Sequence, residues 1–272
     1  FSGCFFLEKV ALKSTQNILD SQYQSFLSEE DSLLAREAAA GNIKMIDGLL
    51  LKSPNDANLQ LLSSKACFSY AFGYIEPENE QRASNFYLRG LNRAASKMGG
   101  DKIFFDMKFP EFEKKCIKDM PKLLEHYFWG VLNFSCWVNL NKSDINALNN
   151  RNKIELTGNE IIKNNESYYY GGGHLILGLY YSSLPVSLGG KPALAKAHFE
   201  KCLEINKRMF LPALYFYARY YAVNFQDKEL FLSLLSEIES FDLNKFHEQR
   251  LSNAIIKERA MVLKREADNY FV

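Results

Sequence analysis

The sequence predicts an all-α fold in which helical hairpins stack into a superhelix, or solenoid. Three observations support this prediction. Apolar residues recur at helical spacing along most of the 272 residues, and no stretch shows the alternation of a strand. Small residues stand near large aromatic ones within apolar segments, as closely packed helix pairs require. Clusters of glycine, proline and asparagine divide the chain into segments of helix length.

The first predicted helices cover the N-terminal part of the chain. Leu7–Leu27 carries apolar residues that face roughly one way, so it is predicted to be a helix. Glu30–Ala40 and Ile43–Lys52 are predicted as two shorter helices, because Gly41 and Asn42 separate them. We expect these helices to cap the N-terminal end of the superhelix.

A helical hairpin is predicted after the turn signal Ser53–Asp56. Its two helices carry small and large residues at the spacing of a packed helix pair. The residues are Cys67, Ala71 and Tyr74 in the first helix and Ala83, Tyr87 and Gly90 in the second. This pair is the first repeat unit of the predicted superhelix.

The middle of the chain contains one strongly apolar segment. Lys97–Pro121 is predicted to be a loop with short helices, because a glycine pair and two prolines interrupt it. Lys122–Leu140 is apolar nearly all round, which is typical of a helix buried on most sides. The polar, asparagine-rich segment that follows, up to Asn165, is predicted to be an outer helix with frayed ends.

The chain is organised around Tyr168–Tyr221, where a known repeat signature occurs. The first helix there matches W-x2-L-G-x2-Y with histidine in the tryptophan place, and the second matches A-x3-F. The matching residues are His174, Leu177, Gly178 and Tyr181, followed by Ala195 and Phe199. This is the tetratricopeptide signature. About four tetratricopeptide-like hairpins are therefore expected, with extra N- and C-terminal capping helices.

The connection inside this hairpin is longer than usual. Tyr181 and Ala195 are 14 positions apart, whereas the regular repeat uses about nine. Ser187–Gly190 is therefore predicted to protrude as a loop, and Pro192 stands where a first-turn proline is tolerated. A cap residue is missing, because Lys191 cannot accept a hydrogen bond at the helix start.

The C-terminal part is predicted to complete and close the superhelix. Tyr217–Tyr221 and the leucines after it form another repeat. Phe246–Phe271 is predicted to be one terminal capping helix with a single apolar stripe. The stripe consists of Leu251, Ile255, Val262, Leu263 and Tyr270.

Composition excludes several classes of function. The chain has 33 Lys and Arg against 32 Asp and Glu, so nothing favours nucleic acid as a partner. No apolar run reaches the roughly 18 residues of a membrane span. The five cysteines are widely spaced without a C-x-x-C pair, which argues against a disulfide framework. Cys67, Cys136 and Cys202 are expected to be buried free thiols.

The sequence shows no convincing catalytic or metal-binding pattern. His198 and Cys202 are one helical turn apart, but two ligands without a third do not make a typical metal site. No nucleophile elbow, P-loop or dinucleotide-binding glycine pattern occurs. Gly171–Gly173 precedes a helix and could bind an anion; close approach to another backbone is the favoured interpretation. We therefore expect no enzyme, no metal and no cofactor.

Aromatic residues between Tyr168 and Tyr221 outnumber what one hairpin core needs. Helix packing could consume all of them, and it is expected to consume Tyr181 and Tyr217. A partly exposed aromatic lining is favoured for the others, because tyrosine offers an apolar face and a hydroxyl to a partner or an amphipathic ligand. The predicted ligand- or partner-binding residues are Tyr168, Tyr169, Tyr170, His174, Tyr180, Phe216 and Tyr220.

Four strings of the C-terminal half resemble a known family. They are SLGGKPALAKAHFEKCLEIN, ALYFYARYYAV, DKELF and LSNAIIKERAMVLKREADNYF. They resemble the T component of TRAP-transporter-associated (TatT) proteins, where TRAP denotes a tripartite ATP-independent periplasmic transporter. The similarity is specific from about Tyr168 to Phe271 and diffuse before that. One departure is Lys191, where the family usually has Asp.

The resemblance implies a set of functional properties. The protein would be a periplasmic lipoprotein of helical repeats that associates with the solute-binding protein of a TRAP transporter. It would form a homotrimer, with a cleft or pore in each protomer that can receive an organic, hydrophobic small molecule. Two other functions stay open: a free-standing carrier of a hydrophobic ligand, and an envelope scaffold without a ligand.

The chain starts with the residues FSGC, in which small residues precede Cys4. Bacterial lipoprotein processing recognises such a pattern, and the family resemblance implies the same, so Cys4 is the predicted lipidation site. The alternative is an ordinary thiol near a frayed terminus. We expect residues 1–6 to be a lipobox remnant and anchor, and residues 7–272 to be a single helical-repeat domain. A lipid anchor would hold the protein at a membrane face in the periplasm.

Overall fold

The computed structural model describes residues 18–19, 21–184, 186 and 190–271, and these residues form helices and turns without any strand. The predicted all-α class is confirmed. Cys4 and residues 1–6 lie outside the described residues, as do most of the predicted helix Leu7–Leu27 and of the predicted loop Ser187–Gly190. Residues 21–27, the described end of that first predicted helix, are helical.

The N-terminal region contains one long helix where two were expected. Helix α2 (Ser32–Lys52) runs through Gly41 without interruption. The predicted break was wrong, because a glycine inside a helix costs only about 1 kcal/mol relative to alanine. Asp31 caps the N-terminus of this helix, since its carboxylate accepts hydrogen bonds from the amides of Leu33 and Leu34.

The first predicted hairpin is present. Helix α3 (Ala57–Tyr70) is capped by Asp56 and continues into the π-helical turn η1 (Ala71–Ile75). Helix α4 (Glu80–Ala95) returns against α3, and Asn79 caps its start. The small residue Gly90 permits close packing, because a Cβ there would overlap the side chain of Asn133.

The segment predicted as a loop before Pro121 is mostly helical. After the short helix α5 (Lys102–Phe105), helix α6 spans Phe109–Leu140 and includes Pro121. The helix continues past this proline with a kink, where Leu123 has non-helical torsion angles of φ −124° and ψ 25°. A proline near the start is also compatible with a helix, as in the first turn of α6. The buried character predicted for the C-terminal half of α6 is confirmed.

The polar segment after α6 is only partly an outer element, because its second helix is packed between two others. It forms α7 (Ile145–Asn150) and α8 (Asn152–Asn164), and α8 packs against both α6 and α9. Close packing is possible because a Cβ on Gly158 would lie only 2.7 Å from Leu177 Cδ2. The polarity of α8 was misleading, because some of its polar groups are buried and hydrogen-bonded rather than exposed.

The central hairpin consists of α9 (Tyr168–Ser182) and α10 (Pro192–Ile205). The close helix packing that the small residues of the sequence predict is confirmed here, since a Cβ on Gly178 would lie 3.0 Å from ring atoms of Phe199. The N-cap of α10, Lys191, makes no side-chain capping hydrogen bond, as predicted. Gly178 and Phe199 therefore contact each other where α9 and α10 pack.

The C-terminal region is more segmented than expected. The elements are α11 (Leu211–Phe216), the π-helical η3 (Tyr217–Ala222), α12 (Lys228–Ser240), the 3-10 helix η4 (Leu243–Gln249), α13 (Arg250–Arg265) and the 3-10 turn η5 (Ala267–Asn269). The single helix predicted for Phe246–Phe271 is thus divided. Val262, assigned to its apolar stripe, is 44% exposed, whereas Leu251, Ile255 and Leu263 are buried.

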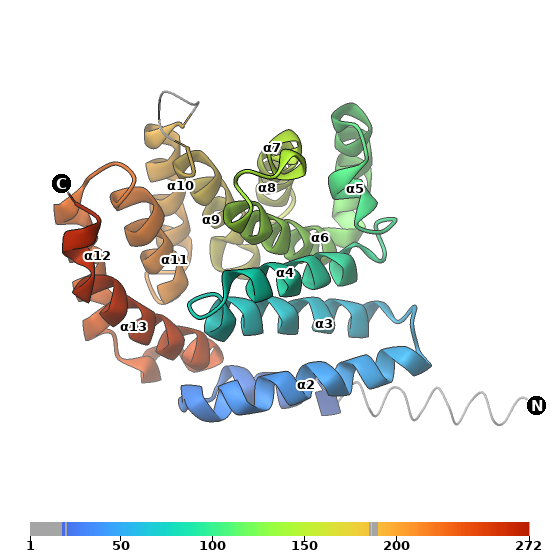
Figure 1. Ribbon diagram of the computed structural model, residues 1–272, viewed down its shortest axis with the longest axis horizontal. Helices are drawn as coiled ribbons and strands as arrows, with labels where there is room; N and C mark the ends of the chain where they lie inside the picture. The colour runs from blue at the N-terminus through green and yellow to red at the C-terminus, as the bar shows by residue number, and fades with distance from the viewer. Residues whose placement is uncertain (1–17, 20, 185, 187–189, 272) are drawn as a thin grey trace, which may run out of the picture.

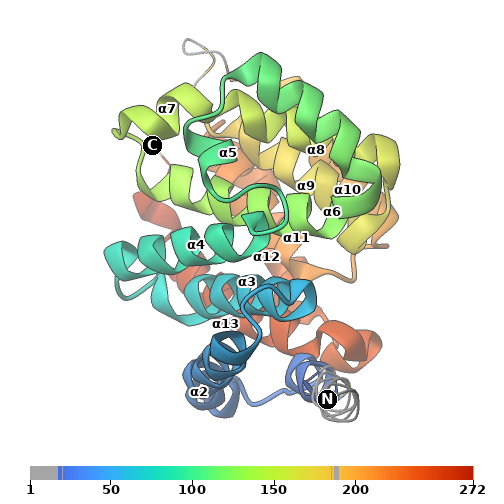
Figure 2. The ribbon, with the colours of Figure 1, turned by 90° about the vertical axis from the view of Figure 1, so that its right-hand side faces the viewer.

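Successive helices pack against one another along the chain, and the two ends of this series also meet. Figure 1 shows α2, α3 and α4 following one another and α11 to α13 returning toward α2; Figure 2 gives the same arrangement from the side. The Ser32 hydroxyl donates a 2.5 Å hydrogen bond to Glu258, and Arg250 pairs with Glu30. Between these two ends, α9 contacts both α6 and η3.

Candidate functional site

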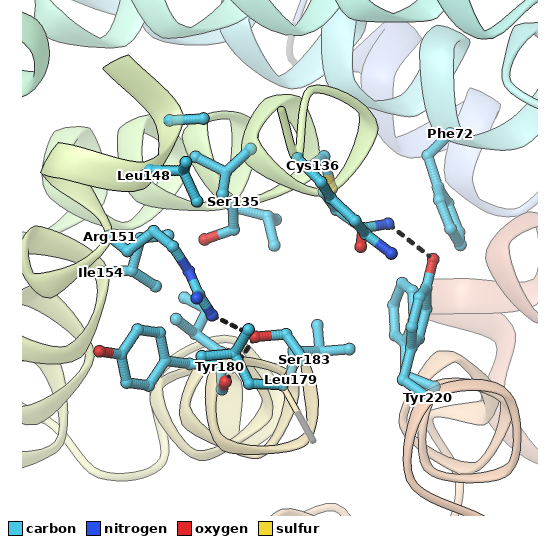
Figure 3. A pocket seen from close by; sticks show the side chains of 18 of the residues that line it. Phe72, Ser135, Cys136, Leu148, Arg151, Ile154, Leu179, Tyr180, Ser183 and Tyr220 are labelled. Atoms are coloured by element: carbon cyan, nitrogen blue, oxygen red, sulfur yellow. Dashed lines mark hydrogen bonds between the residues drawn. The ribbon is translucent and has the colours of Figure 1, made fainter. Parts of the chain in front are cut away.

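An apolar cavity of about 130 Å³ lies between α6, α8, α9 and η3. Figure 3 shows Arg151 and Tyr180 on one side of it and Phe72 and Tyr220 on the other. The side chains of its apolar walls project from several elements. They include Leu132, Ile154, Ile176, Leu179 and Phe216. A cavity with apolar walls and a few polar groups is the usual form of a small-molecule site.

The deep end of the cavity is aromatic. The rings of Phe72 and Phe216 are buried, with centroids 5.1 Å apart, and the ring of Tyr220 lies 5.8 Å from that of Phe216. The amide of Asn139 donates a 3.3 Å hydrogen bond to the Tyr220 hydroxyl. Burial raises the pKa of Tyr220 well above its ordinary value, so this hydroxyl stays neutral. The deep end therefore offers apolar surface and one neutral polar pair.

The mouth of the cavity is marked by lining residues that also reach solvent. Leu148 is 50% exposed, and Lys142 is exposed as well. Close to them in sequence, Arg151 extends across the cavity wall, and its Nη2 donates a 2.6 Å hydrogen bond to Ser183 Oγ. The guanidinium also lies 5.6 Å from the centre of the Tyr180 ring. Two cationic side chains thus line this part of the cavity.

The carboxylate in the cavity lining, Glu76, already has partners. It accepts a hydrogen bond from the Tyr87 hydroxyl, and Arg259 lies 3.6 Å from its other oxygen. Arg259 is itself held by the Phe72 carbonyl, to which it donates a 2.5 Å hydrogen bond. The negative charge of Glu76 is therefore offset within the protein and does not neutralise Arg151.

A second apolar cavity of about 70 Å³ adjoins the first. Phe72, Leu132 and Phe216 belong to the walls of both cavities, so the Phe72–Phe216 ring pair stands between them. Tyr169 and Phe210 line the second cavity but not the first. The centre of the molecule thus contains two apolar spaces with a shared aromatic wall.

Three of the predicted aromatic site residues line the first cavity. Tyr180, Phe216 and Tyr220 contribute to its walls, and Tyr169 contributes to the second cavity. Tyr169 also packs closely, with its ring centroid 4.9 Å from that of Trp129. It therefore takes part in core packing as well as lining a cavity.

The other predicted site residues serve packing contacts. The Tyr168 ring packs 5.1 Å from Phe128, and the Tyr170 ring packs 4.9 Å from Phe210. His174 is buried, and its Nδ1 lies 2.8 Å from Nδ1 of His198 in α10. The structure thus brings the predicted residues to several places rather than to one site.

Tyr169 and Tyr170 adopt an unusual backbone conformation. Together with Gly171 they have positive φ angles, of 45°, 62° and 81°, which form a left-handed turn at the start of α9. Non-glycine residues there cost about 1–2 kcal/mol each. The turn directs the Tyr170 carbonyl toward α10, where it accepts hydrogen bonds from Asn206 Nδ2 at 3.3 Å and Cys202 Sγ at 3.4 Å.

The three glycines after this turn allow close packing, as favoured from the sequence. A Cβ on Gly171 would lie 3.2 Å from the Cα of Cys202 in α10. A Cβ on Gly172 would overlap the Phe128 ring, and one on Gly173 would lie 3.3 Å from the Gly158 carbonyl. Their small size lets α9 approach α6, α8 and α10 together.

Buried reactive side chains are engaged in structural contacts. The Lys153 ammonium donates hydrogen bonds to the carbonyls of Ile103, Phe104 and Met107, which uses all three of its protons. Burial raises the pKa of the Cys67 thiol to about 11 and that of Cys202 to about 12, so neither is a thiolate at neutral pH. Within the described residues, no three potential metal ligands gather.

Arg151, Asn139 and Leu148 were not recognised from the sequence. One signal was available in α6, because Leu132, Cys136 and Asn139 lie on one face of an otherwise apolar helix. A polar residue on such a face can indicate a cavity rather than a core contact. Arg151 carried no comparable signal, since it stands in a polar segment that was assigned to the outside.

The fold and this site together define a class of protein: all-helical chains that enclose an apolar cavity with a few convergent polar groups. No described helix combines the length and the apolarity needed to cross a bilayer. Residues 28–271 match the model of the TRAP transporter T-component family, TAtT. The chain belongs to this family, which links it to TRAP transport systems. A comparison with curated proteins found no match.

Proposed function

We propose that this protein is a periplasmic accessory component of a TRAP transporter that binds the solute-binding protein and holds a small organic ligand. The observation that carries the ligand-binding part is the cavity between α6 and α9, whose walls are apolar and whose polar groups converge. The transport role rests on family membership over residues 28–271.

The mouth of the cavity is a suitable place for the solute-binding protein to dock. Ile145 and Leu148, both on α7, are 63% and 50% exposed. Apolar side chains grouped on a surface often mark an interaction site. Because Leu148 also lines the cavity, a partner bound over α7 would face the ligand directly. Docking and ligand transfer would then use the same surface.

A binding role is favoured over catalysis. The cysteines named above have raised thiol pKa values, and the Lys153 ammonium is fully occupied by backbone carbonyls. Asn139 and Ser183, two polar residues of the cavity wall, each hydrogen-bond a neighbouring side chain. These hydrogen bonds hold the polar groups in place, which suits recognition of a ligand. The protein is therefore proposed to bind its ligand without transforming it.

Membrane attachment and assembly belong to the same proposal. Lipidation of Cys4 would place the protein at a membrane face, and the family resemblance favours a homotrimer. The superhelix of tetratricopeptide-like hairpins is likewise proposed, and the Gly178–Phe199 contact is its best local support. Such a scaffold would expose the cavity mouth of each protomer to its own solute-binding protein.

The docking experiment uses the purified solute-binding protein of the same TRAP system. Leu148→Glu places a charge at the mouth without filling the core, and it should weaken the complex about tenfold or more in sedimentation equilibrium. The matched control is Leu51→Glu, since Leu51 is 85% exposed on α2. Absence of any complex with the unaltered protein would contradict the docking role.

The cavity alone would also suit a free-standing carrier of a hydrophobic ligand. Mass spectrometry of the purified protein separates this candidate from the proposed one. Bound ligand without a complex would favour the carrier, whereas a complex without any ligand would favour a scaffold.

A further inference from the structure

An open groove with several cations, here called the basic groove, lies where α2 ends, α3 begins and α4 ends. Its lining includes Lys44 and Asp47 of α2 and Arg89 and Arg93 of α4. Figure 1 shows the end of α2, the start of α3 and the end of α4 on the same side of the molecule. The basic groove shares no lining residue with either apolar cavity, so it is a separate feature of the surface.

The cations of the basic groove outnumber its carboxylate. Asp47 accepts a hydrogen bond from Arg89, and its oxygens lie 3.4 Å from Arg93 Nη2 and 3.2 Å from Lys44 Nζ. Burial raises the pKa of Asp47, but hydrogen bonds from Arg89 and Lys44 outweigh it and lower this pKa below its ordinary value. Within the described residues, no other carboxylate lies within ion-pair distance of the three cations. Three positive charges therefore face one negative charge.

The donors of the basic groove suit a phosphate-type anion. Lys44 is exposed, and Arg89 and Arg93 are partly exposed, so all three side chains reach solvent. Arg93 Nη1 also donates a 3.4 Å hydrogen bond to Gln60. A guanidinium has five N–H groups, so these contacts hold the two arginines in place and leave donors for an anion. Arginine and lysine are the usual partners of phosphate groups.

An exposed apolar side chain stands beside these cations. Leu51 lines the basic groove and is 85% exposed, whereas its neighbour Leu50 is buried in a cluster with Leu19 and Leu59. A soluble phosphate would gain nothing from Leu51. The phosphate of a membrane lipid is joined to acyl chains, so cations can bind the headgroup while a leucine enters the apolar layer beneath it.

The beginning of the described chain lies at the same end of α2. Leu19 packs against Leu50, and Cys4 stands 15 positions before Leu19 in the sequence. An anchor at Cys4, as proposed above, could therefore lie no farther than about 50 Å from Leu19. Figures 1 and 2 show α7, which carries the proposed docking surface, away from α2 in both views. A membrane at the basic groove would leave the cavity mouth uncovered.

We propose that the basic groove binds the phosphate headgroups of anionic membrane lipids. Lys44, Arg89 and Arg93 contact the phosphates, and Leu51 enters the apolar layer. This contact is additional to a lipid anchor, because an anchor tethers the chain whereas the basic groove orients the folded protein on the membrane. The inference requires neither a ligand in the cavity nor a solute-binding protein.

The test measures co-sedimentation of the whole chain carrying Cys4→Ser with lipid vesicles at neutral pH and low salt. This substitution removes the proposed acylation site, so only the rest of the chain can hold the protein on the vesicles. Vesicles of phosphatidylglycerol and phosphatidylcholine are compared with vesicles of phosphatidylcholine alone. The protein is expected to bind the anionic vesicles about tenfold or more tightly. Added salt should weaken this binding.

Removing cations from the basic groove should weaken binding to the anionic vesicles. Lys44→Gln combined with Arg93→Gln leaves the Arg89–Asp47 pair in place. Affinity should fall about tenfold or more, since each basic residue near an anionic surface contributes about a fivefold factor. Lys44→Gln alone, at an exposed side chain, should give a fall of about fivefold and serves if the double variant does not fold.

The matched control removes the same charge elsewhere. Lys196→Gln combined with Lys201→Gln takes two cations from ion pairs on α10, which does not line the basic groove. Its affinity for the anionic vesicles should stay within about twofold of that of the parent protein. An equal loss in both double variants would mean that only net charge matters, and it would overturn the proposal.

Leu51→Ser and inorganic phosphate distinguish a lipid from a soluble phosphate. Leu51→Ser should lower the affinity for anionic vesicles about threefold or more, because less apolar surface leaves water. Inorganic phosphate, exchanged for chloride at constant ionic strength, should not displace the protein. Displacement by phosphate together with unchanged binding of Leu51→Ser would overturn the lipid proposal in favour of a soluble phosphate.

Equal binding to both kinds of vesicle, or binding to neither, would also overturn the proposal. If the groove variants instead weakened the complex with the solute-binding protein and vesicles were not bound, the basic groove would be a protein contact. Detergent partition of Cys4→Ser tests the anchor, and sedimentation of Leu148→Glu tests docking at α7. Failure of the proposed function is therefore seen separately from failure of the basic groove.

Discussion

The backbone of Gly178 in α9 faces the ring of Phe199 in α10 so closely that a Cβ on Gly178 would lie 3.0 Å from two ring atoms. Phe199 is fully buried and stacks on Tyr217, with ring centroids 4.9 Å apart. The ring therefore has little room to move away. This contact fixes how closely the two central helices approach, and both positions belong to the repeat signature.

The first prediction concerns this contact. Gly178→Leu should lower the free energy of unfolding by about 1–3 kcal/mol, because the added side chain must displace a ring held from both sides. Gly41→Ala is the control. It lies inside α2 with open space around it, and it should stabilise by about 0.5–1 kcal/mol. Urea unfolding measures both; an unchanged midpoint for Gly178→Leu would contradict the packing.

The second prediction concerns the start of α10. Lys191→Asn should stabilise the protein by about 0.5–1 kcal/mol, because its side chain can accept a hydrogen bond from a first-turn amide. Lys191→Asp makes the same bond but brings a negative charge toward Glu155, which lies 3.9 Å from the Lys191 ammonium. Its gain should be smaller. Thermal unfolding distinguishes the two, and a larger gain for Asp would show that Glu155 has no influence.

The third prediction concerns pH. Burial lowers the pKa of His174 and lowers that of His198 to about 4, and both imidazoles share one hydrogen bond. The unfolded chain binds protons near pH 6.5. Between about pH 6.5 and 4 the unfolded state therefore binds more protons, so stability should fall as the pH falls.

The slope should be at most about 1.4 kcal/mol per pH unit for each histidine. Glu166, 3.1 Å from His174 Nε2, opposes the effect, and the charges of Lys201 and Glu204 act on the pair from the surface. His198→Gln should flatten the profile in this window while keeping a polar partner for His174. Urea unfolding at a series of pH values measures it; an equally steep profile in the variant would assign the slope to other groups.

The fourth prediction separates ligand retention from docking. Tyr220→Ala opens the deep end of the cavity, so ligand content should fall while binding to the solute-binding protein stays unchanged. Tyr220→Phe removes only the hydroxyl that accepts from Asn139 and should retain the ligand. Mass spectrometry and sedimentation report the two properties. Loss of docking in Tyr220→Ala would instead make this tyrosine an interface anchor.

The structure changes the expectation for Tyr169, which the sequence analysis predicted as a binding residue. It packs among Phe128, Trp129 and Phe210, so Tyr169→Ala should cost about 2–4 kcal/mol of stability. Its effect on ligand content must therefore be measured well below the unfolding temperature. A fully stable Tyr169→Ala protein would show that these ring contacts carry little energy.

The fifth prediction concerns the proposed anchor at Cys4, which lies outside the described residues. Cys4→Ser should move the protein from the detergent phase to the aqueous phase, because the acyl chains are lost. The fold should be unaffected. Equal partitioning of the two proteins would exclude lipidation at this cysteine.

The helices were largely predictable because their apolar residues follow a helical period and because Asp31, Asp56 and Asn79 cap them. The predicted helix boundaries were wrong where tertiary packing outweighed the local effect of a helix-breaking residue. Gly41 and Pro121 both lie inside helices, since burial of a long apolar face offsets the local cost of either residue.

The cavity was less predictable than the fold. Its walls combine residues from η1, α6, α8, α9 and η3, and no local pattern shows that side chains from such distant segments leave a space between them. The aromatic surplus in the sequence included Tyr180, Phe216 and Tyr220, which line the cavity. It also included Tyr168 and Tyr170, because composition cannot distinguish a ring that lines a cavity from one that fills the core.

The origin of the cavity walls has a consequence for how the protein would respond to the proposed ligand. Phe72 belongs to the first third of the chain and Tyr220 to the last, so the cavity exists only when both regions are folded. A ligand present at about 100 times its dissociation constant would then add about 2.7 kcal/mol to the stability of the whole protein. The unfolded fraction accessible to proteases would fall about a hundredfold, so the supply of the proposed ligand would influence the lifetime of the protein itself.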